Sequence, residues 1–313
     1  MAVREIPELK ADILKLKKQT GTAVLAHLYT DPDVQDIADA CGDSLDMIAA
    51  AQRLGEKRIV VAGVYYTAET IAMLCPDKQI FLAHPQARCP MSGQIYPGRV
   101  RNYREEHPGC LIVTGLSASA QLKAECDLCV TRSNAVDVIR KSRASEILFA
   151  SDCNIGEYLR ENLPDVAIEA WNCSCPMMSS VAVQDVELAR QKWSGAALAV
   201  NMSCRGEIRR LADMVGSAAD IIRYCEAVDW DVMIADEVAV CQKLSRSHPE
   251  RNFRQLAPSK LICSNMQINT LEAVERAIKG EFGIAAEPDP RCADAALEPV
   301  MRMLELSGEG SVE

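Results

Sequence analysis

Three cysteines that each follow a short apolar run are almost evenly spaced along the chain. Cys89, Cys175 and Cys263 lie 86 and 88 residues apart, which is about the length of a small domain. This spacing suggests that the chain contains three structural repeats and that each supplies one thiol to a common centre. A closed zinc site or iron–sulfur cluster normally uses four protein ligands. Three cysteines would therefore hold a 4Fe–4S cluster with one iron open to a substrate.

The composition is that of an ordinary globular protein, and it limits the partners that the chain can have. At 313 residues it is long enough for two or three domains, and its formal net charge of −10 argues against a nucleic-acid-binding surface. Residues 1–20 lack the apolar core of a signal peptide, and no later run reaches transmembrane length. Together with 14 cysteines, these features predict a cytoplasmic protein with reduced thiols, most of them in the core, and no membrane association.

A second feature has the same period as the cysteines. Three segments share the order of an apolar run, a turn, an amphipathic stretch and a small polar turn that opens a further helix. Their first apolar runs end at His27, Gly115 and Asn201, which are 88 and 86 residues apart. Short apolar runs that alternate with helical patterns are typical of βαβ units with parallel sheets. We therefore expect an α/β fold of three small layered domains.

The repeats also give approximate boundaries. The first α/β repeat with its N-terminal helix is expected at 1–92, the second repeat at 93–180, the third at 181–268, and C-terminal helices with a tail at 269–313. The last strand of each repeat is expected at 80–83, 166–170 and 260–263, and the outer helices at 7–18 and 271–279. Residues 308–313 are expected to be disordered.

Two helices begin with residues that can bind the free N–H groups of a helix start. Asp43 with Asp46 forms an Asp-x-x-Asp pattern, and Ser217 with Asp220 forms a Ser-x-x-Asp pattern, both close to a capping box. Helix N-termini at the carboxyl ends of parallel strands also suit a carboxylate or a phosphate. These residues are therefore either ordinary caps or part of an anion-binding centre.

Several segments resemble the signatures of quinolinate synthase, a bacterial enzyme that condenses iminoaspartate with dihydroxyacetone phosphate on the way to NAD. The resemblance begins with Ala26-His27-Leu28-Tyr29, residues 33–39 (DVQDIAD) and Gly42-Asp43-Ser44, and continues in order within 62–69, 129–136, 215–224 and 263–272. It implies three αβα domains with small parallel sheets around a pseudo-threefold axis, and a 4Fe–4S cluster held by Cys89, Cys175 and Cys263. Cys173 is a competing ligand, because it lies two residues before Cys175.

Other positions depart from the family's active-site pattern. The family's Tyr-x-Asn is Gly115-Leu116-Ser117 in this chain, and its His-Pro-Glu-Cys is Asn201-Met202-Ser203-Cys204. A histidine, a threonine and a serine of the family are replaced by Met178, Ala218 and Arg132. His27, Tyr29 and Ser44 of the first repeat are kept. Loss of one general acid or base typically lowers a rate by roughly 10²–10⁴-fold. We therefore expect a paralog that keeps the cluster but has a changed substrate, with a genuine quinolinate synthase as the alternative.

The chemistry implied for such a chain is that of an iron–sulfur-dependent lyase or transferase. An open iron is a Lewis acid that assists the loss of water. We therefore expect dehydration or condensation of a small anionic metabolite, and sensitivity to oxygen. Sulfur transfer at the open iron and a non-catalytic iron–sulfur sensor are further alternatives. The sequence leaves the oligomeric state open.

The candidate site residues follow from the repeat and the resemblance. His27 and Tyr29 are candidate catalytic residues, and Arg132 is a candidate carboxylate clamp because its donors form a planar fork. The other candidate substrate-binding residues are Ser44, Ser133, Asn201 and Ser217. Tyr65 and Tyr66 are either core residues or replacements for the missing phenol, and Cys126-x-x-Cys129 is expected in the core because no partner occurs at zinc-finger spacing.

Overall fold

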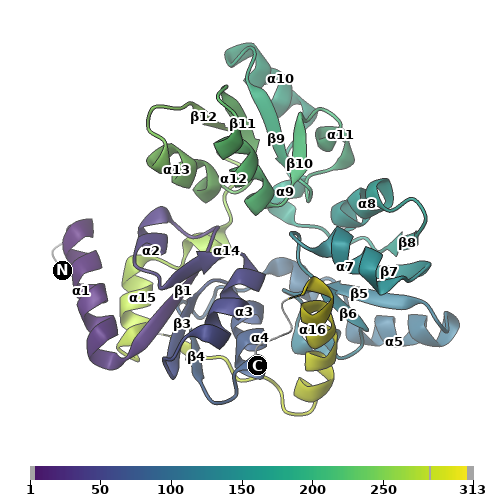
Figure 1. Ribbon diagram of the computed structural model, residues 1–313, viewed down its shortest axis with the longest axis horizontal. Helices are drawn as coiled ribbons and strands as arrows, with labels where there is room; N and C mark the ends of the chain where they lie inside the picture. The colour runs from purple at the N-terminus through teal and green to yellow at the C-terminus, as the bar shows by residue number, and fades with distance from the viewer. Residues whose placement is uncertain (1–3, 282, 309–313) are drawn as a thin grey trace.

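In the computed structural model, which describes residues 4–281 and 283–308, three small α/β lobes surround a common centre (Figure 1). The lobes follow one another along the chain, and each is built on a sheet of its own. Helices flank every sheet. Three small, predominantly parallel sheets confirm the predicted fold class.

The strand order is the same in each sheet. Counted within a lobe, the order is fourth, third, first and second, and all of these pairs are parallel. The first lobe contains β1 (Thr22–His27), β2 (Ala40–Gly42), β3 (Arg58–Ala62) and β4 (Gln79–Leu82). The second contains β5 (Leu111–Gly115), β6 (Leu128–Val130), β7 (Glu146–Ala150) and β8 (Ala167–Ala170). The third contains β9 (Ala197–Asn201), β10 (Met214–Gly216), β11 (Val232–Ala235) and β12 (Phe253–Gln255). A short strand, β13 (Ile284–Ala285), pairs antiparallel with β4.

The helices repeat in the same way. The first lobe has α1 (Ile6–Thr20), α2 (Pro32–Asp36), α3 (Ser44–Arg53) and α4 (Tyr65–Leu74). The second has α5 (Pro97–Glu106), α6 (Ala120–Lys123), α7 (Ala135–Ser142) and α8 (Cys153–Asn162), and the third has α10 (Val183–Lys192), α11 (Gly206–Arg209), α12 (Ala218–Ala227) and α13 (Val238–Ser247). Single helical turns follow the three evenly spaced cysteines, namely η1 (Pro90–Gly93), α9 (Pro176–Ser179) and α14 (Ser264–Gln267). Two further helices are α15 (Leu271–Ile278) and α16 (Ala293–Ser307).

One side-chain hydrogen bond recurs at the same place in every lobe. An aspartate just before the second strand accepts the backbone N–H of a residue in the first strand, and so fastens the short second strand beside it. The pairs are Asp39 with Val24 at 2.7 Å, Asp127 with Ile112 at 2.8 Å, and Asp213 with Leu198 at 2.7 Å. Successive pairs are again 88 and 86 residues apart. The internal repeat therefore extends to the hydrogen bonds that shape each lobe.

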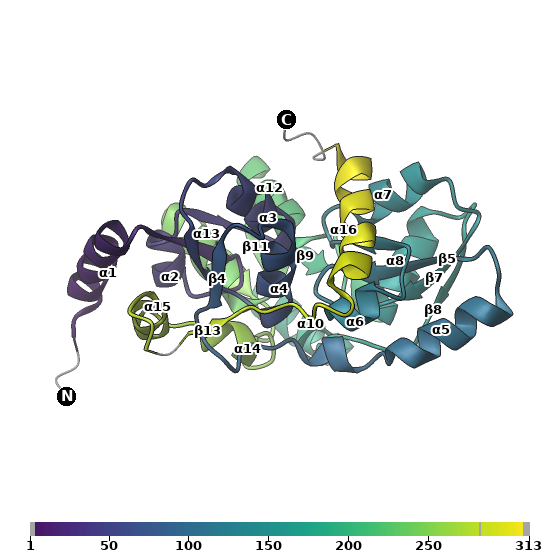
Figure 2. The same cartoon turned by 90° about the horizontal axis from the view of Figure 1, so that it is seen from below.

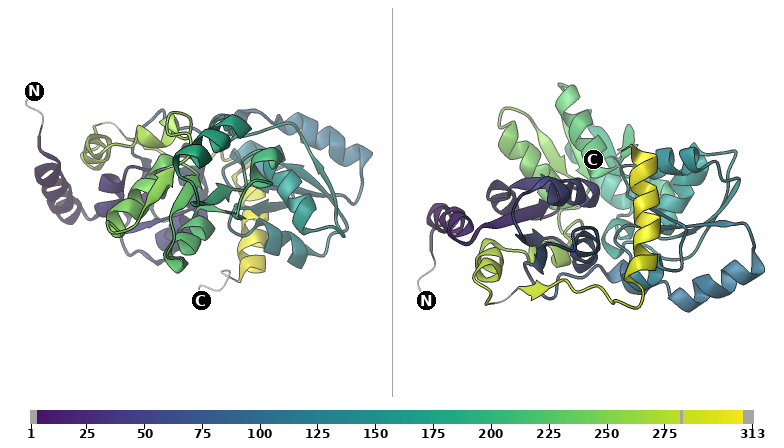
Figure 3. Two further views of the ribbon diagram at one scale, coloured as in Figure 1. Left: turned by 90° about the horizontal axis from the view of Figure 1, so that it is seen from above. Right: turned by 60° about the horizontal axis from the view of Figure 1, so that its bottom comes forward.

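The last helix joins lobes that are distant from it in sequence. α16 runs between the first and second lobes (Figures 2 and 3). Its residues Val300, Met303 and Leu304 are buried in an apolar cluster that also contains side chains of both lobes. At the outer edge of the first lobe, α1 packs against α15. Apolar burial of this kind holds the lobes around the centre, because exposing these side chains would cost free energy in proportion to their area.

The expected strand at 260–263 is wrong. The fourth strand of the third lobe is β12, in which only Phe253 is buried, so this edge strand gives little hydrophobic signal. After it the chain turns at Ala257, whose φ is +44°, and the N–H groups of Lys260 and Leu261 both donate to its carbonyl. The segment is therefore a turn that leads into the third cysteine.

The described chain ends just after α16, at Gly308. This glycine has a φ of +80°, a left-handed conformation that glycine adopts without steric cost. Residues 309–313, most of the segment for which we expect disorder, lie outside the described residues. None of the helices within 4–281 and 283–308 combines the length and the apolar character needed to cross a membrane.

Candidate active site

The three evenly spaced cysteines lie around one cavity between the lobes. Cys89, Cys175 and Cys263 all line this cavity, which has a volume of about 470 Å³. Each cysteine is the residue that precedes a single helical turn, η1, α9 or α14, and its backbone is extended. Three loops from three lobes thus present their thiols to the same space.

Each cysteine loop is fastened by an equivalent backbone hydrogen bond. The N–H at the start of the helix after the third strand donates to the carbonyl two residues before the cysteine. The donor and acceptor pairs are Tyr65 with Ala87 at 2.8 Å, Cys153 with Cys173 at 2.6 Å, and Val238 with Leu261 at 2.9 Å. This shared anchor explains why the three thiols occupy equivalent positions around the cavity.

The surroundings of the thiols favour a bound cation. Burial raises the pKa of all three thiols, to about 12 for Cys263. The backbone N–H groups three residues further on, in the following helical turn, oppose this and lower the pKa. Three thiolates buried around one cavity need a compensating positive charge. Cys89, Cys175 and Cys263 are therefore the residues that could hold a metal centre in this cavity as sulfur ligands.

His27 ends β1 and lies on the wall of the same cavity. Its Nδ1 accepts the backbone N–H of Tyr29 at 3.0 Å, so the neutral ring carries its proton on Nε2. Burial lowers the pKa of His27 to about 4, an effect that Asp43 opposes and Arg132 reinforces. At neutral pH the imidazole is therefore uncharged and can donate a hydrogen bond from Nε2.

A buried polar network lies behind Tyr29 and joins the first lobe to the third. The Asn201 side chain, at the end of β9, donates from Nδ2 to Tyr29 Oη at 3.2 Å and to Asp236 Oδ2 at 2.8 Å. The Tyr29 hydroxyl also bonds Asp236, which lowers the pKa of that carboxyl, although burial raises it more. Burial and Asp236 raise the pKa of Tyr29 well above its ordinary value. Tyr29 therefore keeps its proton and donates it to Asp236, which leaves its oxygen as an acceptor.

Arg132 follows β6 and brings a cation to the cavity wall. Its Nε donates to the hydroxyl of the buried Ser203 at 2.8 Å. Within the described residues this is the one hydrogen bond of its guanidinium, and no carboxylate there lies within the 4.0 Å of an ion pair. The two NH₂ groups of Arg132 are therefore available to a ligand.

The helix starts near the cavity are capped by their own side chains. The predicted capping boxes at Asp43 and Ser217 are both present, so the first N–H groups of α3 and α12 already have acceptors. Gly42 and Gly216 precede these caps, and a Cβ at either would lie within 2.6 Å of the second capping residue. Glycine is therefore required for the tight turn into each helix. The structure thus shows the capping role of these residues, whereas the NH₂ groups of Arg132 lack a protein partner among the described residues.

The hydroxyl groups predicted at the site have partners within the protein. Ser44 Oγ lies 3.0 Å from Thr67 Oγ1, and Ser133 Oγ donates to Asp43 Oδ2 at 2.6 Å. The Ser217 hydroxyl donates to Asp220 at 2.6 Å within its capping box. Ser133 and Ser217 can serve a ligand as acceptors or by giving up these bonds, whereas Ser44 can also donate when Thr67 donates to it.

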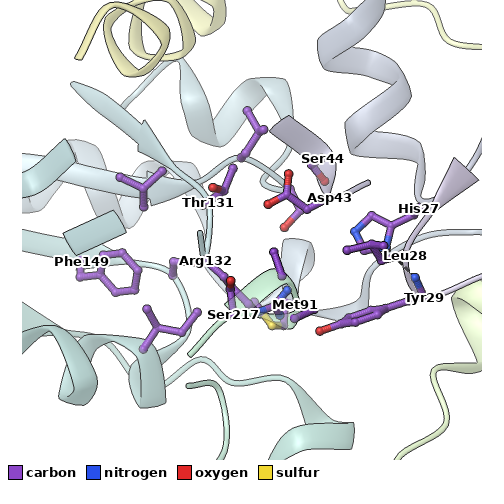
Figure 4. Close-up of a pocket in the computed structure, with 18 residues that line it drawn as sticks. His27, Leu28, Tyr29, Asp43, Ser44, Met91, Thr131, Arg132, Phe149 and Ser217 are labelled. Atoms are coloured by element: carbon purple, nitrogen blue, oxygen red, sulfur yellow. Dashed lines mark hydrogen bonds between the residues drawn. The ribbon is translucent and has the colours of Figure 1, made fainter. Parts of the chain in front are cut away.

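A smaller cavity of about 70 Å³ adjoins the first one and shares part of its wall. Four of the predicted residues line both cavities: His27, Tyr29, Ser44 and Arg132. Figure 4 shows His27 and Tyr29 on one side of the smaller cavity and Phe149 on the other. Ser217 lines only the smaller cavity, whereas Ser133 and Asn201 line neither and bond residues that do.

The competing candidates lie elsewhere. Cys173 is buried and lines a separate small cavity, with its Sγ directed to the Met91 carbonyl at 3.9 Å. Tyr65 and Tyr66 are absent from the walls of both cavities described above. Cys126 and Cys129 are buried in the second lobe, as expected for core thiols.

The donor set of the larger cavity fits an iron–sulfur cluster better than a single ion. Among the described side chains, no three His, Cys, Asp or Glu residues converge as the ligands of one metal ion would. The cysteines of a cubic cluster lie farther apart than that, because each binds a different iron. Three thiols around about 470 Å³, with His27 and Tyr29 on the same wall, fit a cluster that has one open position.

Three buried acidic residues at the site are missing from the sequence prediction. Asp152, Asp236 and Glu237 are all fully buried, and each follows the third strand of its lobe by one or two residues. Their position directly after an apolar run is a usable signal, because ligands of α/β proteins lie at the carboxyl ends of strands. The signal is weak, because two of the three, Asp152 and Glu237, also cap helices.

Comparisons with known proteins match this chain to one family over almost its whole length. The family model described as "Quinolinate synthetase A protein" matches residues 11–305. Similar curated proteins include the quinolinate synthase of Aquifex aeolicus, 32% identical over 97% of this chain and 95% of that protein. Those of Thermotoga maritima (34% identical, 95% of this chain and 99% of that protein) and Alkaliphilus metalliredigens (32%, 94% and 97%) are further examples.

Proposed function

Because this chain belongs to the quinolinate synthetase A family, we propose that it is an enzyme that binds a 4Fe–4S cluster through Cys89, Cys175 and Cys263. We further propose that it carries out a dehydration or condensation of a small anionic metabolite. The observation that carries this proposal is that the three thiols share one cavity wall with His27, Tyr29 and Arg132. When bound, the cluster would supply an open iron that acts as a Lewis acid toward a substrate oxygen.

Arg132 supports the choice of an anionic substrate. Its NH₂ groups form a planar fork that matches a carboxylate or a phosphate in a bidentate way. The Nε bond to Ser203 holds the guanidinium in place from the side away from that fork. A charge-assisted pair of this kind contributes about 1.5–3 kcal/mol for each hydrogen bond.

His27 and Tyr29 are suited to opposite hydrogen-bonding roles toward the substrate, one as donor and the other as acceptor. The neutral imidazole of His27 donates from Nε2, so it suits a carbonyl or hydroxyl oxygen. The Tyr29 oxygen accepts, because its proton goes to Asp236, so it suits a substrate hydroxyl. Together they can orient a substrate oxygen, because His27 donates a hydrogen bond to it and Tyr29 accepts one from its hydroxyl.

The walls of the site support a substrate different from that of quinolinate synthase. Gly115 offers no side chain, and a Cβ there would lie 2.8 Å from the Ser151 hydroxyl, so a phenol at this position requires Ser151 to move. Asn201 and Ser203 are occupied by bonds to Tyr29 and Arg132. Asn201 and Ser203 thus support Tyr29 and Arg132 from behind the cavity wall, and they add no further acid–base group to it.

A second candidate function is quinolinate synthesis itself. It is favoured by the 32–34% identity to curated quinolinate synthases over almost the whole chain. An anaerobic assay with iminoaspartate and dihydroxyacetone phosphate separates the two candidates. Formation of quinolinate at an enzymatic rate supports the second, and its absence from cluster-loaded protein supports a changed substrate.

The test of the leading proposal has two parts. Protein purified without oxygen should contain about four iron and four sulfide per chain. In a thermal-shift panel of small carboxylates and phosphates, at least one should stabilise the protein, and Arg132→Gln should abolish that shift. Arg140→Gln, which changes an exposed arginine on α7, is the matched control. Absence of iron, or an anion response that does not depend on Arg132, would refute the proposal.

A further inference from the structure

Two of the three cysteine loops are held by a buried carboxylate. The backbone N–H of Cys175 donates to Asp152 Oδ2 at 3.2 Å, and that of Cys263 donates to Glu237 Oε1 at 3.1 Å. Both acids are fully buried and both occupy the N-cap of the helix that follows the third strand, α8 or α13. The two bonds are therefore equivalent features of the second and third lobes.

Each carboxylate is held rigidly by further bonds. Asp152 uses its other oxygen to accept the N–H of Asn154 at 3.0 Å, and Glu237 accepts the N–H of Ala239 at 2.7 Å. Glu237 Oε1 also accepts Gln267 Nε2 at 3.0 Å. In each carboxylate, one oxygen thus caps a helix and the other accepts the N–H of the cysteine. The carboxylate therefore fixes the position of the cysteine loop relative to the rest of its lobe.

The first lobe lacks this device. The residue at the equivalent N-cap, before α4, is Val64, whose side chain cannot accept a hydrogen bond. The loop of Cys89 keeps the backbone anchor from Tyr65 to Ala87, and the Ser92 hydroxyl in the following turn donates to the Ser117 carbonyl. The three cysteines are therefore alike in their backbone anchor and unlike in their side-chain support.

We propose that Asp152 and Glu237 are positioning residues that hold the loops of Cys175 and Cys263 and, in their carboxylate form, add negative charge beside two of the three cluster ligands. This inference rests on the cluster of the proposed function. Net charge and hydrogen bonding around a cluster set its reduction potential. Two carboxylates beside the ligands disfavour an added electron, which keeps a cluster in its oxidised form for Lewis-acid chemistry.

Isosteric amides test the effect of the charge. Asp152→Asn and Glu237→Gln keep an oxygen that can accept the cysteine N–H but remove the negative charge. In cluster-loaded protein, each variant should have a higher reduction potential than the unmodified protein, measured by a redox titration followed by electron paramagnetic resonance. Glu69→Gln is the control, because Glu69 is also buried and accepts a backbone N–H, but that N–H belongs to Ala120, at 2.9 Å, and not to a cysteine loop.

Alanine variants test the holding of the loops. Asp152→Ala and Glu237→Ala should lose iron to a chelator roughly 10–100-fold faster, the range found when residues that support metal ligands are removed. In the protein without cluster, limited proteolysis should cut the corresponding loop faster in the alanine variant than in the unmodified protein. Far-UV circular dichroism identifies a variant that fails to fold, and the amide variants then decide.

The outcomes separate the inference from the function on which it rests. Unchanged potentials in both amide variants, together with unchanged chelation rates in the alanine variants, would overturn the inference while leaving a cluster enzyme. Failure of the unmodified protein to bind iron would overturn the proposed function. In that case the proteolysis still decides whether the two carboxylates hold their loops.

Discussion

The guanidinium of Arg132 and the hydroxyl of Ser203 are joined by a 2.8 Å hydrogen bond, although the residues are 71 positions apart. The bond connects the second lobe to the third at the wall of the central cavity. It uses Nε alone, so that the geometry of the guanidinium is set by the protein while its fork remains free. This relationship is the basis of the anionic substrate proposed above.

Replacement of Arg132 should weaken anion binding more than replacement of Ser203, which holds the Arg132 guanidinium. Arg132→Gln should lower the affinity for inorganic phosphate or succinate by roughly 10–100-fold, since a hydrogen bond to a charged group contributes about 1.5–3 kcal/mol. Ser203→Ala should give a smaller loss, because the charge remains. Isothermal titration calorimetry provides both affinities. Equal binding by Arg132→Gln and unmodified protein would show that the anion lies elsewhere.

The three cavity cysteines should be needed for the cluster and their neighbours should not. Cys89→Ser, Cys175→Ser and Cys263→Ser should each lose most iron and the brown colour of anaerobically purified protein. Cys173→Ser should keep both, because Cys173 faces a different cavity. Iron analysis and visible absorption are the measurements. If Cys173→Ser lost its iron while Cys175→Ser kept it, Cys173 would be the cluster ligand in place of Cys175.

The network behind Tyr29 should contribute to stability. Asn201→Ala removes the donor to both Tyr29 and Asp236, and leaves a buried carboxylate with one partner fewer. We expect the free energy of unfolding to fall by about 1–3 kcal/mol, the usual cost of a buried polar group that loses its partner. Urea unfolding measures the change. Asn162→Ala, which removes an exposed amide bonded to Tyr158, is the control and should cost far less.

The anchoring of α1 should depend on pH through Glu275. This carboxylate, on α15, accepts Arg4 Nη1 at 3.0 Å and Lys279 Nζ at 2.9 Å, and its pKa is lowered to about 2, first of all by the hydrogen bond from Arg4. A carboxyl with a lowered pKa stabilises the folded state above its ordinary value of 4.5, and this stability is lost as the pH falls from 4.5 toward 2.

Hydrogen exchange of the α1 amides measures this dependence locally. Exchange should accelerate, after correction for its intrinsic pH dependence, as the pH falls through that window, and Glu275→Gln should remove the change. High salt should reduce it only in part, because Arg4 is partly exposed while Glu275 is buried. Glu8→Gln, an exposed position of α1 itself, is the control. A pH response that survives Glu275→Gln would assign it to another group.

Much of the architecture could be predicted because it is encoded in local patterns. The ends of β1, β5 and β9 at His27, Gly115 and Asn201 follow from apolar runs, and the capping boxes follow from residues three apart. The prediction of a strand at 260–263 was wrong because it too relied on a local pattern. A turn with an apolar residue looks like a strand in sequence, whereas β12 has only one buried residue.

The sequence by itself determined the threefold repeat, the parallel lobes and the spacing of the three cysteines, because each depends on the order of residues within one segment. Only the tertiary structure decided which polar groups face one another across the lobes. Arg132 meets Ser203, and Asn201 meets both Tyr29 and Asp236. The physical reason is that a buried polar group is stable only with a partner, and here the partners come from different lobes.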